Sequence, residues 1–203
     1  TFTVQQKEGV TWASVQKAME QCLLLADEVT LLDPKFVIVG DGRTASGVTT
    51  TFIGIRLVRS DASGLVGYKS DIVPLTVCAT KEDYNTVKAL LEEVLTELEC
   101  LQTDGFQWED HRGVVRKIKP LLFLGGDMKW LHIVTGISTP RFCCIHCMVT
   151  EAQRTTCKGP LPTLWEMNRA PAESSVDEEG RKRPNLFWFI PTERICPDFC
   201  TCT

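Results

Sequence analysis

Two aspartates follow apolar segments whose composition is typical of buried strands. Asp41 comes directly after "KFVIVG" and Asp127 directly after "PLLFLGG", and short apolar runs bounded by glycine predict strands. If the two strands are neighbours in one sheet, both carboxylates lie at the same edge, where each makes ionisation of the other less favourable. A divalent cation removes that repulsion, and Mg²⁺ prefers carboxylate, water and phosphate oxygens. A pair of Mg²⁺ or Mn²⁺ ions about 4 Å apart can activate a water molecule and stabilise the leaving oxygen in phosphodiester cleavage.

The residues around the two acids allow a second interpretation. An aspartate beside glycine at a strand end is also a common turn residue or helix N-cap. Arg43 and Lys129 each follow an acid closely and could contact a phosphate, although solvated surface charge is the alternative for both. Glycines without side chains would let a phosphate backbone approach; those beside the acids are Gly40, Gly42, Gly125 and Gly126.

The elements that must position the acids follow from the hydrophobic pattern. The predicted order is helix, strand, strand, strand, helix, strand, helix, over residues 10–26, 35–40, 49–58, 72–79, 80–101, 118–124 and 128–136. Pro74 indicates that the third strand is an edge strand or begins later. Residues 103–113 are polar and predict a turn. His132, in the last helix, is expected to be a packed or hydrogen-bonded histidine.

Length, charge and composition limit the classes of protein. The chain has 203 residues, 43% of them hydrophobic, and a net charge of −4, which fits one globular domain without an overall basic footprint for nucleic acid. No apolar run reaches about 18 residues and no signal peptide opens the chain, so no membrane span is expected. The five tryptophans are scattered and are expected mostly in the core rather than on a base-stacking platform.

Seven of the ten cysteines are clustered, and this favours a metal site over disulfides. The Cys-x-x-Cys pair Cys144 and Cys147 is predicted to bind zinc, which needs four ligands at a structural site. The C-terminal cysteines would supply the second pair, as Cys196 with Cys200 or with Cys202. Buried or free cysteines in a reducing compartment are the alternative.

Three stretches together resemble a known family: "VIVGDGRTASG", "YKSDIVPLTVCATKEDYNTVKALLEEVL" and "KPLLFLGGDMKWLHIVTGISTPRFCCIHC". In this order they resemble the RNase H-like catalytic core of DDE transposases, in the lineage of the V(D)J recombinase catalytic subunit, over roughly residues 35–150. The resemblance implies DNA strand cleavage or transfer with Mg²⁺ or Mn²⁺. It implies that Asp41 and Asp127 are the first two metal-binding acids, and that Cys144 and Cys147 are a zinc-binding pair.

The chain also departs from that family. The family's third acid is a glutamate on a later helix, and Glu166 in "LWEMNR" is the one weak candidate here. The family completes its zinc site with a later histidine pair, but no histidine follows Cys147. A second hypothesis is therefore a catalytically inactive, domesticated transposase fragment that binds DNA or protein and retains zinc. A third is a different Mg²⁺-dependent phosphate-handling α/β enzyme, although Arg43 interrupts the Asp-x-Asp pattern of phosphatases.

The sequence predicts an α/β, RNase H-like mixed sheet flanked by helices, with a small cysteine-containing C-terminal appendage. The expected divisions are an N-terminal helix packed on the core within residues 1–34, the core itself over 35–150, and an irregular appendage over 151–203. Expected partners are DNA and a second copy of the chain, without a membrane, in an intracellular and nuclear setting. We also expect the chain to be a fragment of a longer protein or a processed product.

Overall fold

The computed structural model describes residues 4–7, 10–24, 26–45, 47–61, 64–66, 71–79, 83–137, 145 and 183–197. Eight strands form one mixed sheet: β1 (Val4–Lys7), β2 (Val10–Ala13), β3 (Lys35–Ala45), β4 (Val48–Asp61), β5 (Gly64–Val66), β6 (Val73–Cys78), β9 (Leu121–Gly126) and β10 (Ile195–Pro197). A separate hairpin consists of β7 (Phe106–Glu109) and β8 (Val115–Ile118). The helices are α1 (Val15–Leu23), α2 (Glu28–Leu32), α3 (Tyr84–Asp104), α4 (Met128–Thr135) and the 3₁₀ helix η3 (Thr192–Arg194).

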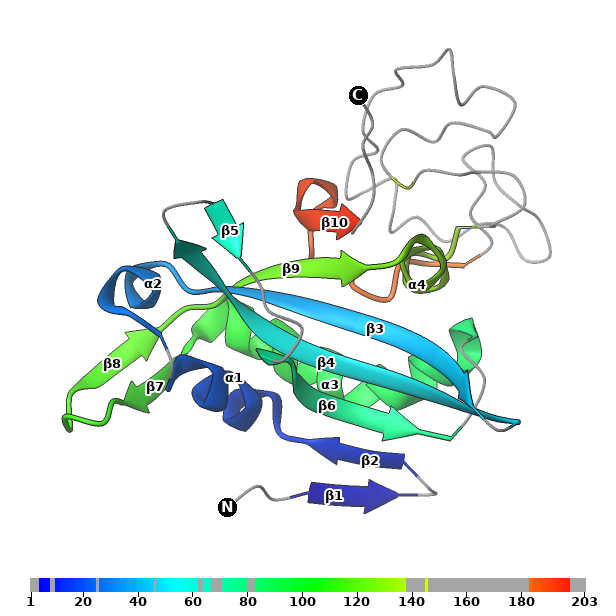
Figure 1. The fold of residues 1–203 in the computed structure, drawn as a ribbon, viewed down its shortest axis with the longest axis horizontal. Coiled ribbons are helices and arrows are strands. Elements are labelled where there is room, and N and C mark those ends of the chain that lie inside the picture. Colours follow the sequence, from blue (N-terminus) through cyan, green and yellow to red (C-terminus); the bar gives the residue numbers. More distant parts are fainter. Residues whose placement is uncertain are drawn as a thin grey trace, which may run out of the picture.

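The five central strands lie in the order β6-β4-β3-β9-β10. The first three form an antiparallel meander, and β9 and β10 then run parallel to β3 (Figure 1). Helix α3 follows the meander and leads through the β7–β8 hairpin to β9, so the chain crosses over to reach a strand parallel to β3. This is the predicted α/β architecture, a mixed sheet flanked by helices, and it is consistent with an RNase H-like arrangement.

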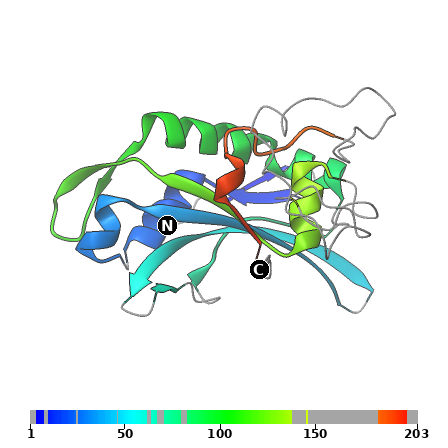
Figure 2. The same cartoon turned by 90° about the horizontal axis from the view of Figure 1, so that it is seen from above.

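The sheet has a helix-covered face and an outer face. Helices α1 and α4 both contact α3, and Figure 2 shows the helices on one side of the strands. On β3, Phe36 and Ile38 are fully buried in the core that the helices share with the sheet. Strand residues alternate between faces, so Val37, Val39 and Asp41 belong to the outer face.

The seven apolar residues that α3 turns toward the core follow the helical spacing read from the sequence. All are buried: Val87, Leu90, Leu91, Val94, Leu95, Leu98 and Leu101. The helix begins slightly later than predicted, because Asp83 rather than Thr80 is the N-cap and accepts a hydrogen bond from the backbone N–H of Thr86. Among the helices of the described part of the chain, none combines the length and the apolar character that a membrane span requires.

The predicted N-terminal helix over residues 10–26 is wrong at its beginning. Residues 10–13 form strand β2, which pairs with β6, and α1 starts at Val15. Periodicity alone missed this boundary because the helix start depends on a distant residue. Glu97 of α3 accepts hydrogen bonds from Ser14 Oγ at 2.8 Å and from the backbone N–H groups of Val15 and Gln16 at 2.9 and 3.0 Å. A carboxylate at a helix N-terminus satisfies free N–H groups and complements the helix dipole.

We predict that Glu97→Gln lowers the free energy of unfolding by about 1–2 kcal/mol, because hydrogen bonds to a charged acceptor become bonds to a neutral one. Urea unfolding followed by circular dichroism measures the change. Glu93→Gln, an exposed position on the same helix, is the control and is expected to stay within about 0.5 kcal/mol of the wild type. Equal losses in the two variants would contradict this capping role.

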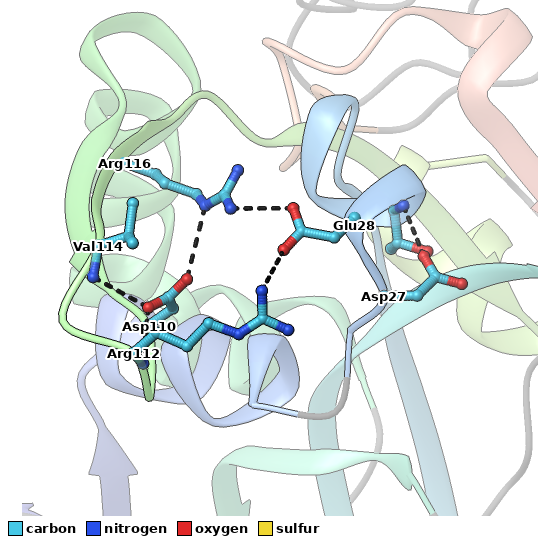
Figure 3. Close-up of polar contacts among 7 residues, drawn as sticks. Asp27, Glu28, Asp110, Arg112, Val114 and Arg116 are labelled. Atoms are coloured by element: carbon cyan, nitrogen blue, oxygen red, sulfur yellow. Dashed lines mark hydrogen bonds and ion pairs between the residues drawn. The ribbon is translucent and has the colours of Figure 1, made fainter.

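The region 103–113, predicted as a turn, contains strand β7 as well as the turn of the β7–β8 hairpin. Asp110 organises the hairpin by accepting backbone hydrogen bonds from Val114 at 3.0 Å and Arg112 at 2.8 Å. These bonds, that of Val114 above all, lower the pKa of the Asp110 carboxyl. Figure 3 shows Glu28 of α2 between Arg112 and Arg116, to which it pairs at 3.5 and 2.9 Å. The polar sequence therefore encodes a charged connection between the hairpin and α2, which a turn prediction does not capture.

Pro74 lies inside β6, where one neighbour is missing. β2 pairs with β6 only at Thr76 and Val77, so the proline occupies an edge position within an otherwise internal strand. It also faces Gly54 where the β4–β6 register shifts. Both features remove the need for a ladder hydrogen bond from the proline nitrogen.

Residues 183–197 pack on the main body. Tyr84 donates a hydrogen bond from its hydroxyl to the Pro184 carbonyl at 2.8 Å, and Leu186 donates its backbone N–H to the Val134 carbonyl at 2.8 Å. The segment then ends in β10, paired with β9. A three-residue strand has too short a pattern to be recognised from sequence.

Candidate metal-binding site

The two acids follow paired positions on neighbouring parallel strands. Gly40 of β3 is the register partner of Gly126 of β9. Asp41 and Asp127 are the residues that follow these two glycines. Adjacent strands in a sheet are about 4.8 Å apart, so the backbones of the two residues lie near each other beyond the paired glycines. Both are exposed. The backbone register therefore places the two residues that the sequence singled out at neighbouring positions.

Asp127 is also the N-cap of α4. Its Oδ1 accepts a hydrogen bond from the backbone N–H of Trp130 at 2.7 Å. The second interpretation of this residue, a helix cap, is therefore correct, but it occupies only one carboxylate oxygen. No described residue donates a hydrogen bond to Oδ2, and Asp41 has no hydrogen bond or ion pair with the residues that the structure describes. Three carboxylate oxygens can thus serve as metal ligands.

Trp130 explains two of the four glycines beside the acids. A Cβ atom on Gly126 would lie 2.7 Å from Cδ1 of Trp130, and one on Gly40 would overlap the same indole. The two glycines therefore make room for a fully buried tryptophan on the helix side of the sheet. This corrects the expectation that they admit a phosphate backbone. Gly125 faces Val37 on the outer side instead.

Gly136 determines where α4 ends and how the chain returns to it. Its φ of 75° is left-handed, and its N–H donates to the carbonyls of His132 and Ile133. A Cβ atom there would collide with the carbonyl of Arg183. Glycine is therefore required both for the helix C-cap and for close packing of the segment that leads to β10.

His132 is a buried titratable residue on α4, the helix that Asp127 caps. Only 5% of it is exposed, and its Nε2 finds no hydrogen-bond partner among the described residues. Burial lowers the pKa of His132, and the negative charge of Asp127 offsets part of that decrease. The ring is therefore neutral at pH 7, as expected for a packed histidine, and it experiences the charge at the site.

The sequence's other metal candidates fall in two groups. Glu166, Cys144, Cys147, Cys200 and Cys202 lie outside the described residues. Cys196 is described: it is exposed in β10 opposite Gly125, and partial burial raises the pKa of its thiol. Within the described ranges, no group of three or more His, Cys, Asp or Glu side chains is arranged to hold a metal ion.

The end of β10 was missed by sequence reasoning although it borders the site. Pro197 pairs with Gly126, which is itself the partner of Gly40. β9 and β10 therefore end at the level of Gly40, with Asp127 following β9, whereas β3 continues to Ala45. Lys129 and Arg43, the two predicted phosphate contacts, are both exposed near this edge.

No protein-family model matches the chain, and no curated protein is significantly similar to it.

We predict that the pKa of His132, measured by NMR titration of its ring protons, lies below about 6.5. Asp127→Asn should lower it further because the favourable charge is removed, while asparagine still caps the helix. Since the unfolded state binds the proton more tightly, the histidine's contribution to stability is complete above about pH 6.5 and decreases as the pH falls toward the folded pKa.

Asp104→Asn is the control for this titration, since Asp104 is exposed at the far end of α3. It should leave the pKa of His132 unchanged. An identical pKa in wild type and Asp127→Asn would show that the Asp127 carboxylate does not act on this ring.

Proposed function

We propose that this chain is a transposase-derived, RNase H-like domain that acts on DNA phosphodiesters with divalent cations held by Asp41 and Asp127. The observation that carries the proposal is the Gly40–Gly126 register pair, since Asp41 and Asp127 are the next residues along the two parallel strands. The strand order β6-β4-β3-β9-β10 supports it, because the resemblance to DDE transposases implies that topology around these two acids.

The donor set fits a hard cation such as Mg²⁺ or Mn²⁺. Two carboxylates with three oxygens not engaged by described residues leave coordination positions for water and phosphate, which Mg²⁺ retains in its protein sites. When bound, the metal supplies activation of water and stabilisation of the leaving oxygen. Asp41 and Asp127 hold it, and the cap on Trp130 N–H keeps the Asp127 carboxylate oriented. Catalysis also requires a third acid, for which Glu166 is the candidate.

A second candidate function is an inactive binding module with the same fold. The absence of a third acidic ligand from the described surroundings of the pair favours it, as does the net charge of −4. In that case the domain binds DNA or protein, in a nuclear setting and as a homodimer, without cutting DNA. Metal binding and strand cleavage must therefore be measured separately.

We predict that Mn²⁺ broadens the amide NMR signals next to Asp41 and Asp127, and that Mg²⁺ competes with it. Asp41→Asn and Asp127→Asn should each weaken this binding by at least about tenfold, because one carboxylate alone is a poor ligand set. Asparagine keeps the N-cap acceptor, so Asp127→Asn separates loss of charge from loss of the cap. Asp104→Asn is the matched control, and Mn²⁺ should broaden its amide signals as it does those of the wild type.

The same variants decide between the two functions when Mg²⁺-dependent nicking of labelled supercoiled DNA is measured. Nicking by the wild type that is lost in both site variants supports the enzyme. Metal binding without nicking supports the inactive module. Mn²⁺ effects spread evenly over the protein surface would rule out a site at these two acids.

The proposal also includes a structural zinc ion at Cys144 and Cys147, completed by Cys196 with Cys200. Elemental analysis of the purified protein should find about one zinc per chain, since a structural site takes four ligands. Cys144→Ser should reduce that content strongly, whereas Cys100→Ser, at an exposed free cysteine on α3, should leave it unchanged. A zinc content that is the same in both variants would refute the assignment.

A further inference from the structure

Strands β3 and β4 continue beyond Asp41 as a two-stranded arm. β3 and β4 stay paired from Lys35 and Val58 to Ala45 and Val48, but β9 ends opposite Gly40, and β6 reaches only Thr51. Residues 43–45 and 48–50 therefore extend as a two-stranded ribbon beyond the neighbouring strands (Figure 1). This ribbon, together with the register pair Asp41 and Phe52 at its base, is here called the arm. Along residues 41–45 no described strand covers the outer edge of β3.

Register assigns the side chains of the arm to faces. Residues directly opposite in an antiparallel pair share a face, and the pairs are Asp41 with Phe52 and Arg43 with Thr50. Gly40, on the other face, is covered by Trp130. Asp41, Arg43 and Phe52 therefore belong together on the outer face, the face not occupied by α4.

The ring of Phe52 and the side chain of Ile72 both lie close to Gly54. A Cβ atom on Gly54, two residues along the same face, would be 2.8 Å from Cζ of the Phe52 ring. The missing side chain at Gly54 lets the ring rest against the backbone, and the residue is only half-buried. A half-buried aromatic residue is thus the register partner of a candidate metal ligand.

Arg43 supplies a positive charge beside that ring. It is exposed and makes no ion pair with any described residue. Two residues along a strand correspond to about 6.6 Å, which separates it from Asp41. In a chain of net charge −4, residues 42–58 contain two arginines and no acid, so this hairpin is locally suited to a polyanion.

We propose that the outer face of the arm binds single-stranded DNA next to the scissile phosphate, with Arg43 on a backbone phosphate and Phe52 stacked on a base. An arginine and an aromatic ring on an exposed strand surface are the combination that binds single strands with little sequence preference. A single strand is favoured over a duplex because the base must be free to stack on Phe52. The inference rests on the proposed function, since Asp41 marks the position of the reacting phosphate.

The test is fluorescence anisotropy of a labelled single-stranded oligonucleotide with the full chain in EDTA. Phe52→Leu should weaken binding about 5- to 100-fold, the range for loss of one stacked base, whereas Phe52→Tyr should retain it. Arg43→Gln should weaken binding and reduce the slope of log affinity against log salt by about 0.7, the value for one phosphate on a single strand. Lys117→Gln, an exposed cation on β8, is the matched control and should leave the slope unchanged.

EDTA separates this inference from the metal-dependent function. Because EDTA removes divalent cations, oligonucleotide binding is measured without the metal, so failure of the nicking experiment leaves the binding result valid. Wild-type affinity in both Arg43→Gln and Phe52→Leu overturns the proposal, as does an undetectable affinity of the wild type. A duplex that competes better than the single strand also overturns it. Thermal unfolding shows whether the variants are folded. If Phe52→Leu does not fold, the affinity and salt dependence of Arg43→Gln test the proposal.

Discussion

The contact between Trp130 and the glycine pair Gly40 and Gly126 determines the geometry of the site end of the molecule. The indole lies so close to both strands that a Cβ atom on either glycine would overlap it. The ring is fully buried, and replacing a buried tryptophan with a small residue typically costs about 3–5 kcal/mol. This packing holds the first turn of α4 against the ends of β3 and β9, and so it also determines where Asp127 lies relative to Asp41.

Asp127 has a structural and a chemical role that use different atoms. Oδ1 accepts a hydrogen bond from the backbone N–H of Trp130. Asp127, which caps the helix, is therefore bonded directly to Trp130, which packs the helix against the sheet. Oδ2 is not engaged by any residue in the described ranges. The cap therefore orients the carboxylate without using up its capacity to bind a cation, which is how a common N-cap can also be half of a metal site.

Long-range contacts complete the fold at both ends of the chain. Glu97 caps α1 from the middle of α3, and Tyr84 holds the segment that ends in β10. Neither partner is marked by local sequence, because the donors and acceptors are about 80 to 100 residues apart. Such contacts explain why the start of α1 was misassigned, while α3, with its continuous apolar stripe, was recognised.

The sequence by itself determined the strands of the meander, the crossover helix and the position of Asp127 after β9, because period-2 and period-3.6 patterns and glycine-bounded apolar runs are local signals. It ended the first strand before Asp41, but β3 continues to Ala45 because β4 remains paired with it there. Only the tertiary structure decided that Gly40 and Gly126 accommodate Trp130 rather than a phosphate. The indole comes from a helix that is remote from β3 in sequence, so its fit cannot be read from either segment. The same holds for the arm, since the face shared by Asp41, Arg43 and Phe52 depends on the register between two strands and on where their neighbours end.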